Sequence, residues 1–253
     1  MTNFLTFYQN IGLGLSIVVL AVFTLAGTVK GVIGLGLPTV SMGLLGLAMP
    51  TPQAAALLII PSTLSNLWQL AQGGNLRPLL KRLMPMLLAV LAGTLLGSAW
   101  LGLGAGPGVV RALGGALLLY AVLGLCLPTL NVSPAHETWM GPLCGLLTGM
   151  VTAATGVFVI PAVPYLQALR LGRDELVQAL GLSFTVSTAA LAVGLAGQGQ
   201  LTGELLGASL MLVLPTLLGM AVGQWLRHRI SAAAFKQVFF IGMALLGAHL
   251  MIG

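Results

Sequence analysis

Long apolar runs follow one another along almost the whole chain, and too few charged residues separate them to form a water-facing surface. Only 6% of the 253 residues are charged and 58% are hydrophobic, whereas roughly 25% of the residues in a soluble domain are charged. Runs such as 11–29 and 83–103 are about as long as the roughly 20 residues that a transmembrane helix needs. The sequence therefore predicts an all-α, polytopic membrane protein surrounded by a lipid bilayer.

The apolar runs form an internal repeat, because features of the first half return about 125 residues later. The ten runs cover residues 11–29, 32–49, 53–70, 83–103, 109–127, 138–157, 158–169, 176–196, 203–226 and 233–252. The matching features are Pro38 with Pro161, Gln53 with Gln178, Ser62-Thr63 with Ser187-Thr188, Gly93 and Gly97 with Gly219 and Gly223, and Arg111 with Lys236. We predict a first transmembrane repeat over residues 1–127, a linker over 128–137 and a second repeat over 138–253. Pro61 is expected to break the third run.

Basic residues indicate the orientation of the helices, because cytoplasmic loops of membrane proteins are enriched in Lys and Arg. If the N-terminus lies outside and every run crosses, nine of the ten basic residues lie on the cytoplasmic side and only Arg111 lies outside. Arg111 is the counterpart of Lys236, so an odd number of crossings per repeat would turn the halves upside down relative to each other. The first two runs of each half either cross fully or form a hairpin inside the membrane. We therefore predict two inverted repeats of about four to five transmembrane helices each.

A glycine-rich stretch near the start of the first repeat interrupts the apolar pattern. It reads GTVKGVIGLGLP over residues 27–38 and contains Lys30, Gly34, Gly36 and Pro38. Its glycines and proline disfavour a continuous helix. Glycine leaves backbone amides open to a ligand, and Lys30 offers the matching charge for an anion. The alternative is a tight cytoplasmic turn in which Lys30 is an ordinary positive-inside anchor.

The second repeat contains a matching break between residues 154 and 161, with Gly156 and Pro161. A broken helix in lipid exposes backbone groups, so such breaks are tolerated where protein or a ligand in a wet cavity satisfies them. Inverted repeats with interrupted helices at matching positions are typical of secondary transporters. Because the N-termini of half-helices carry partial positive charge, two that face each other would hold an anion. These re-entrant glycine-proline segments are therefore the predicted centre of the site.

Polar side chains in the third and eighth runs are candidates for hydrogen bonds to a substrate. Ser62, Asn66 and Gln69 are spaced by three to four residues, which places them on roughly one helical face. Ser187 and Thr188 occupy the corresponding region of the second half. The alternative is that these groups bond to their own backbone or to a neighbouring helix. Burial of Asn66 and Gln69 is the more costly, which favours a functional role for them.

The acidic residues exclude several classes of function. All four of them, Glu137, Asp174, Glu175 and Glu204, lie in or next to loops, so a cation substrate would lack a buried negative partner. The sequence contains no cluster of metal ligands, no hydrolytic triad and no nucleotide-binding loop, so we expect no metal, no cofactor and no enzymatic activity. The formal net charge of +6 is spread over short loops, as expected of positive-inside anchors and not of a nucleic-acid-binding surface.

The chain resembles the sulfite exporter TauE/SafE family of membrane transporters over nearly its whole length. The likeness depends on GTVKGVIGLGLP, on the following AAALLIIPSTLSNLWQ, and on GLLTGMVTAATGVFVIPAVPYLQAL in the second half. The resemblance implies two related halves and the movement of sulfite, sulfonates, thiosulfate or other small organic anions across the cytoplasmic membrane, often outward.

We therefore expect a secondary transporter that exports a small anion by alternating access. The alternatives are a passive anion channel and a membrane assembly subunit that transports nothing. The small anion and the bilayer are the expected partners, and glycine-rich runs would permit a homodimer. The predicted substrate-binding residues are Lys30, Gly34, Gly36, Pro38, Ser62, Asn66, Gln69, Gly156, Pro161, Ser187 and Thr188.

Overall fold

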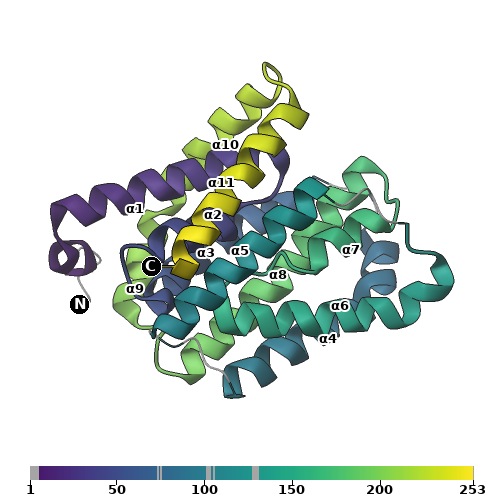
Figure 1. Cartoon of the computed structure of the whole chain (residues 1–253), viewed down its shortest axis with the longest axis horizontal. Coiled ribbons are helices and arrows are strands. Elements are labelled where there is room, and N and C mark those ends of the chain that lie inside the picture. Colours follow the sequence, from purple (N-terminus) through teal and green to yellow (C-terminus); the bar gives the residue numbers. More distant parts are fainter. Residues whose placement is uncertain are drawn as a thin grey trace.

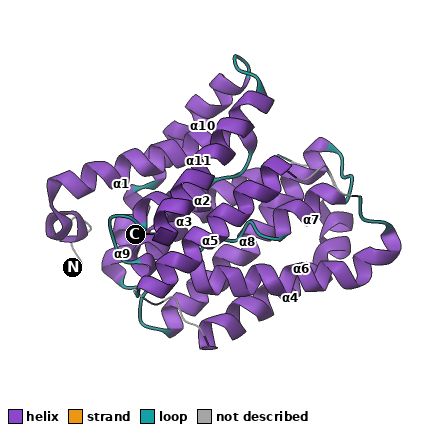
Figure 2. Ribbon diagram, viewed as in Figure 1, coloured by secondary structure: helices purple, strands orange, loops and turns teal. Residues whose placement is uncertain are grey.

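The computed structural model describes residues 6–72, 74, 76–100, 104, 106–126 and 131–252, which form helices and contain no strands (Figure 2). The helices are α1 (Thr6–Ile33), α2 (Leu37–Leu45), α3 (Thr51–Ala71), α4 (Leu76–Trp100), α5 (Pro107–Cys126), α6 (Pro134–Thr155), α7 (Ala162–Ala168), α8 (Arg173–Gly197), α9 (Gly203–Met211), α10 (Val213–Arg227) and α11 (Ala232–Ile252). The ends predicted for the fourth and fifth runs, at 103 and 127, and the first linker residues, 128–130, lie outside the described residues. Helix α6 begins at Pro134, within the predicted linker.

Seven segments of the described chain are long and apolar enough to cross a membrane, which confirms an all-α, polytopic membrane protein. They are α1, α3, α4, α5, α8, the joined α9–α10 segment Gly203–Arg227, and most of α11. Helix α6 is not among them, although its 22 residues pack along α4. The break between α9 and α10 at Leu212 precedes Pro215, whose ring clashes with the backbone one turn earlier.

The two helices that follow the glycine-rich stretches are too short to cross a bilayer. Helix α2 has nine residues and α7 has seven, and at 1.5 Å per residue nine residues rise only about 14 Å, whereas the hydrocarbon core is about 30 Å thick. Both helices are mostly buried in the protein. Of the two alternatives for these segments, the lengths favour the hairpin that turns back inside the membrane.

The first helix of each predicted repeat packs against a helix of the other half (Figure 1). In the α4–α6 pair, a side chain added at Gly93 would meet the Leu146 backbone, and one added at Gly149 would meet Val90. In the α1–α10 pair, Gly27 faces Thr216 and Gly31 faces Met220.

In each pair, later residues of one helix contact later residues of the other. The two helices of each pair therefore run parallel. Closely packed glycines hold both pairs together, as is common between membrane helices.

Two pairs of helices at matching positions of the predicted repeats pack antiparallel to one another. In the α3–α8 pair, Ser62 contacts Thr188 and Leu70 contacts Gln178. In the α5–α11 pair, Gly114 lies against Gly247 whereas Gly124 lies against Phe240. These antiparallel contacts are the relation that inverted repeats require, and the inversion itself stays a prediction.

The predicted break at Pro61 is wrong, because α3 is continuous from Thr51 to Ala71. Proline has no N–H, so it leaves the carbonyl of Leu57 without its usual partner in the helix. Ser209 of α9 supplies the missing hydrogen bond, since its Oγ donates to the Leu57 oxygen at 2.7 Å. The same hydroxyl accepts from the amide of Ile60 at 3.2 Å. A side chain from the other half therefore stabilises the helix where the proline would weaken it.

Candidate functional site

Lys30 lies in the last turn of α1 and is buried, with 3% of its surface exposed. Its Nζ donates hydrogen bonds to Ser65 Oγ at 2.9 Å and to Asn66 Oδ1 at 2.5 Å. No carboxylate pairs with it among the described residues, where the one ion pair joins Arg82 and Glu137. A buried lysine that has only neutral acceptors is costly to charge unless an anion lies beside it. The end of α1 is therefore a favourable place for an anion.

A chain of hydrogen bonds leads from Lys30 to the contact between α3 and α8. Asn66 Nδ2 donates to Ser62 Oγ at 3.2 Å and to Thr188 Oγ1 at 3.3 Å. The Ser62 and Thr188 hydroxyls lie 3.1 Å apart. Ser62 and Thr188 come from matching regions of the two halves, so this cluster lies where the halves meet.

The first break separates α1 from α2 over residues 34–36. Gly34 and Gly36 have φ values of 77° and 110°, which side-chain-bearing residues rarely adopt. The Gly34 carbonyl accepts a hydrogen bond from Gln69 Nε2 at 2.5 Å. The amides of Leu35 and Gly36 have no hydrogen-bond partner among the described residues. Pro38 lies in the first turn of α2, where its missing N–H costs nothing.

The second break separates α6 from α7 and leaves a longer extended segment. Gly156 caps α6 with a φ of 71°, and α7 begins after the cis peptide bond at Pro161. The segment between them, residues 157–160, is almost fully buried. The amides of residues 158–160 have no hydrogen-bond partner within the described chain. Buried unpaired amides are rare, which makes these three candidate donors.

Side-chain contacts link the second break to α2 and to α8. A side-chain carbon added at Gly156 would come within 2.7 Å of the Met42 side chain, which belongs to the helix that follows the first break. The Phe158 ring of the second break packs 5.5 Å from the ring of Phe184 in α8. The second break therefore lies beside the helix that follows the first break and beside α8.

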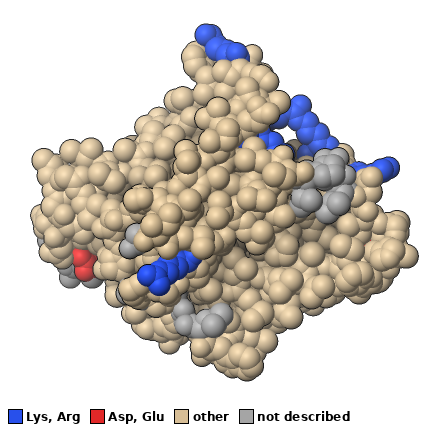
Figure 3. Space-filling view, viewed as in Figure 1, with Lys and Arg blue, Asp and Glu red and all other residues tan. Residues whose placement is uncertain are grey.

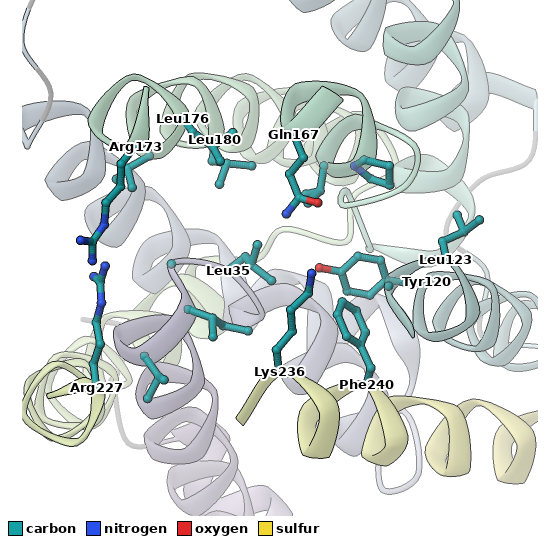
Figure 4. A pocket seen from close by; sticks show the side chains of 17 residues that line it. Leu35, Tyr120, Leu123, Gln167, Arg173, Leu176, Leu180, Arg227, Lys236 and Phe240 are labelled. Carbon is teal, nitrogen blue, oxygen red and sulfur yellow. The ribbon is translucent and has the colours of Figure 1, made fainter. Parts of the chain in front are cut away.

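Two cavities open beside the first break. The larger has a volume of about 550 Å³ and lies between the first break and α5, α7, α8 and α11 (Figure 4). The smaller has a volume of about 250 Å³ and reaches Lys30 between α1, α3 and α10. Gly34, Val177 and Arg227 line both cavities. Gly34 therefore lies on the wall between them.

The charged residues that line these cavities are all basic. Arg173, Arg227 and Lys236 line the larger cavity, and Lys30 and Arg227 line the smaller one beside His228. Figure 4 shows Arg173 and Arg227 pointing toward one another and Lys236 pointing into the cavity. Figure 3 shows Lys and Arg side chains beside a hollow at the upper right, while most of the rest of the visible face carries neither. The field inside both cavities therefore favours an anion.

The family model described as Sulfite exporter TauE/SafE matches residues 19–250. The chain belongs to the TauE/SafE family. No curated protein and no solved structure gives a match. Family membership confirms the resemblance seen in the sequence and makes this a multi-pass protein of a membrane transporter family.

The structure of this TauE/SafE protein brings the predicted residues together in three groups. Lys30, Gly34 and Gln69 line the smaller cavity. Ser62, Asn66 and Thr188 form the hydrogen-bonded cluster, and Ser187 lies buried in the same helix as Thr188 with a hydroxyl that has no partner in the described chain. Gly36 and Pro38 form the start of α2, and Gly156 and Pro161 bound the second break.

Sequence reasoning missed most of the lining of the larger cavity. The polar residues that it missed are Tyr120, Gln167, Arg173, Arg227 and Lys236. The three basic ones were interpreted only as loop charges that indicate orientation. They come from the ends of three different helices, and no spacing along the chain shows that these ends meet at one cavity. An excess of cations at several helix ends that are predicted to be cytoplasmic was the one signal available.

Proposed function

We propose that this TauE/SafE protein is a secondary transporter that exports a small anion, such as sulfite, an organosulfonate or a carboxylate, across the cytoplasmic membrane by alternating access. The observation that carries the proposal is the buried Lys30, which has no carboxylate partner in the part of the chain that the structure describes and lines a cavity together with Arg227. Such a site attracts an anion and repels a cation.

The position of the basic residues supports loading from the cytoplasm. Arg173, Arg227 and Lys236 all belong to the side that the positive-inside rule places in the cytoplasm. The larger cavity is lined by these same residues. An anion that enters from the cytoplasm would therefore meet three cations before it reaches the first break.

The broken helices supply the remaining ligands of the proposed site. Lys30 supplies the charge of the proposed site. The unpaired amides of the second break and the Gln69 amide group at the first break are neutral donors that would add hydrogen bonds to the same anion. Helices α1 and α6 end at these breaks, and each packs against a helix of the other half, α10 and α4 respectively. Rocking of one pair relative to the other around the two breaks would open the site to either side in turn.

The proposal is tested by anion flux into proteoliposomes that contain the purified protein. Lys30→Met removes the buried charge and keeps most of the side-chain volume. Lys81→Met is the matched control, because Lys81 is exposed at the start of α4. Because a hydrogen bond to a charged group contributes about 1.5–3 kcal/mol, we expect Lys30→Met to lower the flux of sulfite or of an organosulfonate at least tenfold and Lys81→Met to leave it unchanged.

A counterflow measurement separates the transporter from a channel. Vesicles loaded with unlabelled anion should transiently accumulate labelled anion if the site alternates, and a passive channel shows no such accumulation. Equal flux in the wild type and in Lys30→Met would refute the role of Lys30. Absence of flux for every sulfur oxyanion, sulfonate and carboxylate tried would overturn the proposed function.

A further inference from the structure

Tyr120 is a buried polar side chain that nothing described above explains. It belongs to α5, is 2% exposed and lines the larger cavity. Its hydroxyl has no hydrogen-bond partner among the described residues. Buried hydroxyls are normally hydrogen-bonded, so an unpaired one at a cavity wall is a candidate donor to a ligand.

Lys236 of α11 brings a positive charge to the same part of the cavity. Figure 4 shows that Lys236 and Tyr120 both reach the same part of the cavity. The Lys236 Nζ lies 5.5 Å from the centre of the Phe240 ring, and no carboxylate lines this cavity. A phenol and an ammonium that converge without an acceptor between them form a receptor for an anionic group, because charge-assisted hydrogen bonds are short and strong.

The walls around this pair are apolar. Leu35, Leu123, Val163, Leu176, Leu180 and Phe240 line the same cavity. A volume of about 550 Å³ falls within the range of pockets that bind organic ligands of drug-like size. A bare oxyanion such as sulfite would occupy the two donors and leave these walls facing water.

We propose that Tyr120 and Lys236 bind the anionic group of an organic anion whose apolar body, aromatic or alkyl, lies against Phe240 and Leu123. The inference rests on the proposed transport function and deepens it by naming the substrate class. The donors fit a sulfonate and a carboxylate equally, because both present oxygens with a single negative charge. The apolar body is therefore the feature that the site selects.

The corresponding place in the other half lacks this arrangement. At the repeat offset of about 125 residues, Lys236 matches Arg111, but Phe240 matches Gly115 and Tyr120 matches Leu245. Only the charge is retained. The site for the apolar body therefore lies at the larger cavity and has no equivalent at the matching position of the other half. This asymmetry suits a protein that loads its substrate from one side of the membrane.

The test compares anions of equal charge and different body. Counterflow and binding to the purified full-length protein are measured with methanesulfonate and benzenesulfonate, and with acetate and benzoate. Because burying a ring the size of a Phe side chain is strongly favourable, the aromatic member of each pair should bind about tenfold more tightly. Preference within one pair only would identify which head group the donors take.

Substitutions then place the preference at this site. Tyr120→Phe removes only the unpaired hydroxyl, so it should leave the melting temperature unchanged or raise it while benzenesulfonate binding weakens about tenfold. Lys236→Gln should weaken binding at least as much, and Arg111→Gln, at the matching position of the other half, should leave it unchanged.

Equal binding of the two members in both pairs, or unchanged binding of the preferred aromatic anion in Tyr120→Phe, would overturn the inference. If sulfite flux that depends on Lys30 persists in that case, the proposed function stands without this substrate class. If the wild type moves and binds no anion at all, both are overturned.

Discussion

A substitution in the α1–α10 contact tests whether the glycines set the distance between these helices. A Cβ atom added at Gly223 would lie 2.1 Å from the Thr28 oxygen and 2.9 Å from the Gly31 Cα. These are backbone atoms, so no side chain can rotate away, and the helices must separate by more than 1 Å to reach an ordinary contact. Overpacking of this kind lowers the free energy of unfolding by about 3 kcal/mol at the upper end of the observed range. The higher helix propensity of alanine offsets up to about 1 kcal/mol of this loss.

We therefore expect Gly223→Ala to be about 2 kcal/mol less stable than the wild type, which for a chain of this length lowers the melting temperature by roughly 4–8 °C. The matched control is Gly242→Ala in α11, where an added Cβ meets nothing within 4 Å. The control should melt at or slightly above the wild-type temperature. The assay is the temperature at which the detergent-purified protein loses its monodisperse peak in size-exclusion chromatography. If Gly223→Ala has the same melting temperature as Gly242→Ala, the close approach of α1 and α10 is refuted.

Two further outcomes follow from the structure. Asn66→Ala removes an acceptor of the Lys30 ammonium and leaves that buried charge short of a partner, so it should destabilise the protein by about 1–3 kcal/mol, seen as a lower melting temperature in the same assay. Cysteines placed at Lys81 and Arg111, in a background without the native cysteines, should react with a membrane-impermeant maleimide from opposite sides of the membrane. Labelling of both from one side would contradict the predicted orientation.

Much of the fold could be predicted from the sequence, because a bilayer restricts a chain to lengths and patterns that are readable locally. The run 83–103 predicted α4, and the stretch 27–38 predicted the break that ends α1. Pro61 led to a wrong prediction for a reason that is not local. The hydroxyl that compensates for it belongs to Ser209, far along the chain, and a single-segment pattern contains no information about such a partner.

Some residues of the candidate site could likewise be predicted from the sequence and others could not. Lys30 and Asn66 could be selected because a lone charge and a lone amide in apolar runs are costly to bury, and the structure joins them by a hydrogen bond. Tyr120 could not be selected, since an aromatic residue in a membrane helix is common. What makes it unusual is the unpaired hydroxyl beside a cavity, and that depends on how α5 and α11 pack.

The pairing of α1 with α10 has a consequence for how the protein is made. The glycines of α1 that face Thr216 and Met220 belong to the start of the chain, and their partner helix is synthesised only after nearly all the rest has been inserted. Until then the face of α1 that carries these glycines stays in contact with lipid or with the insertion machinery. Contacts between such distant segments form late. A ribosome that stalls before α10 would therefore leave a fragment in which the glycine face of the first helix lacks its partner, and quality-control proteases of the membrane would meet it in that state.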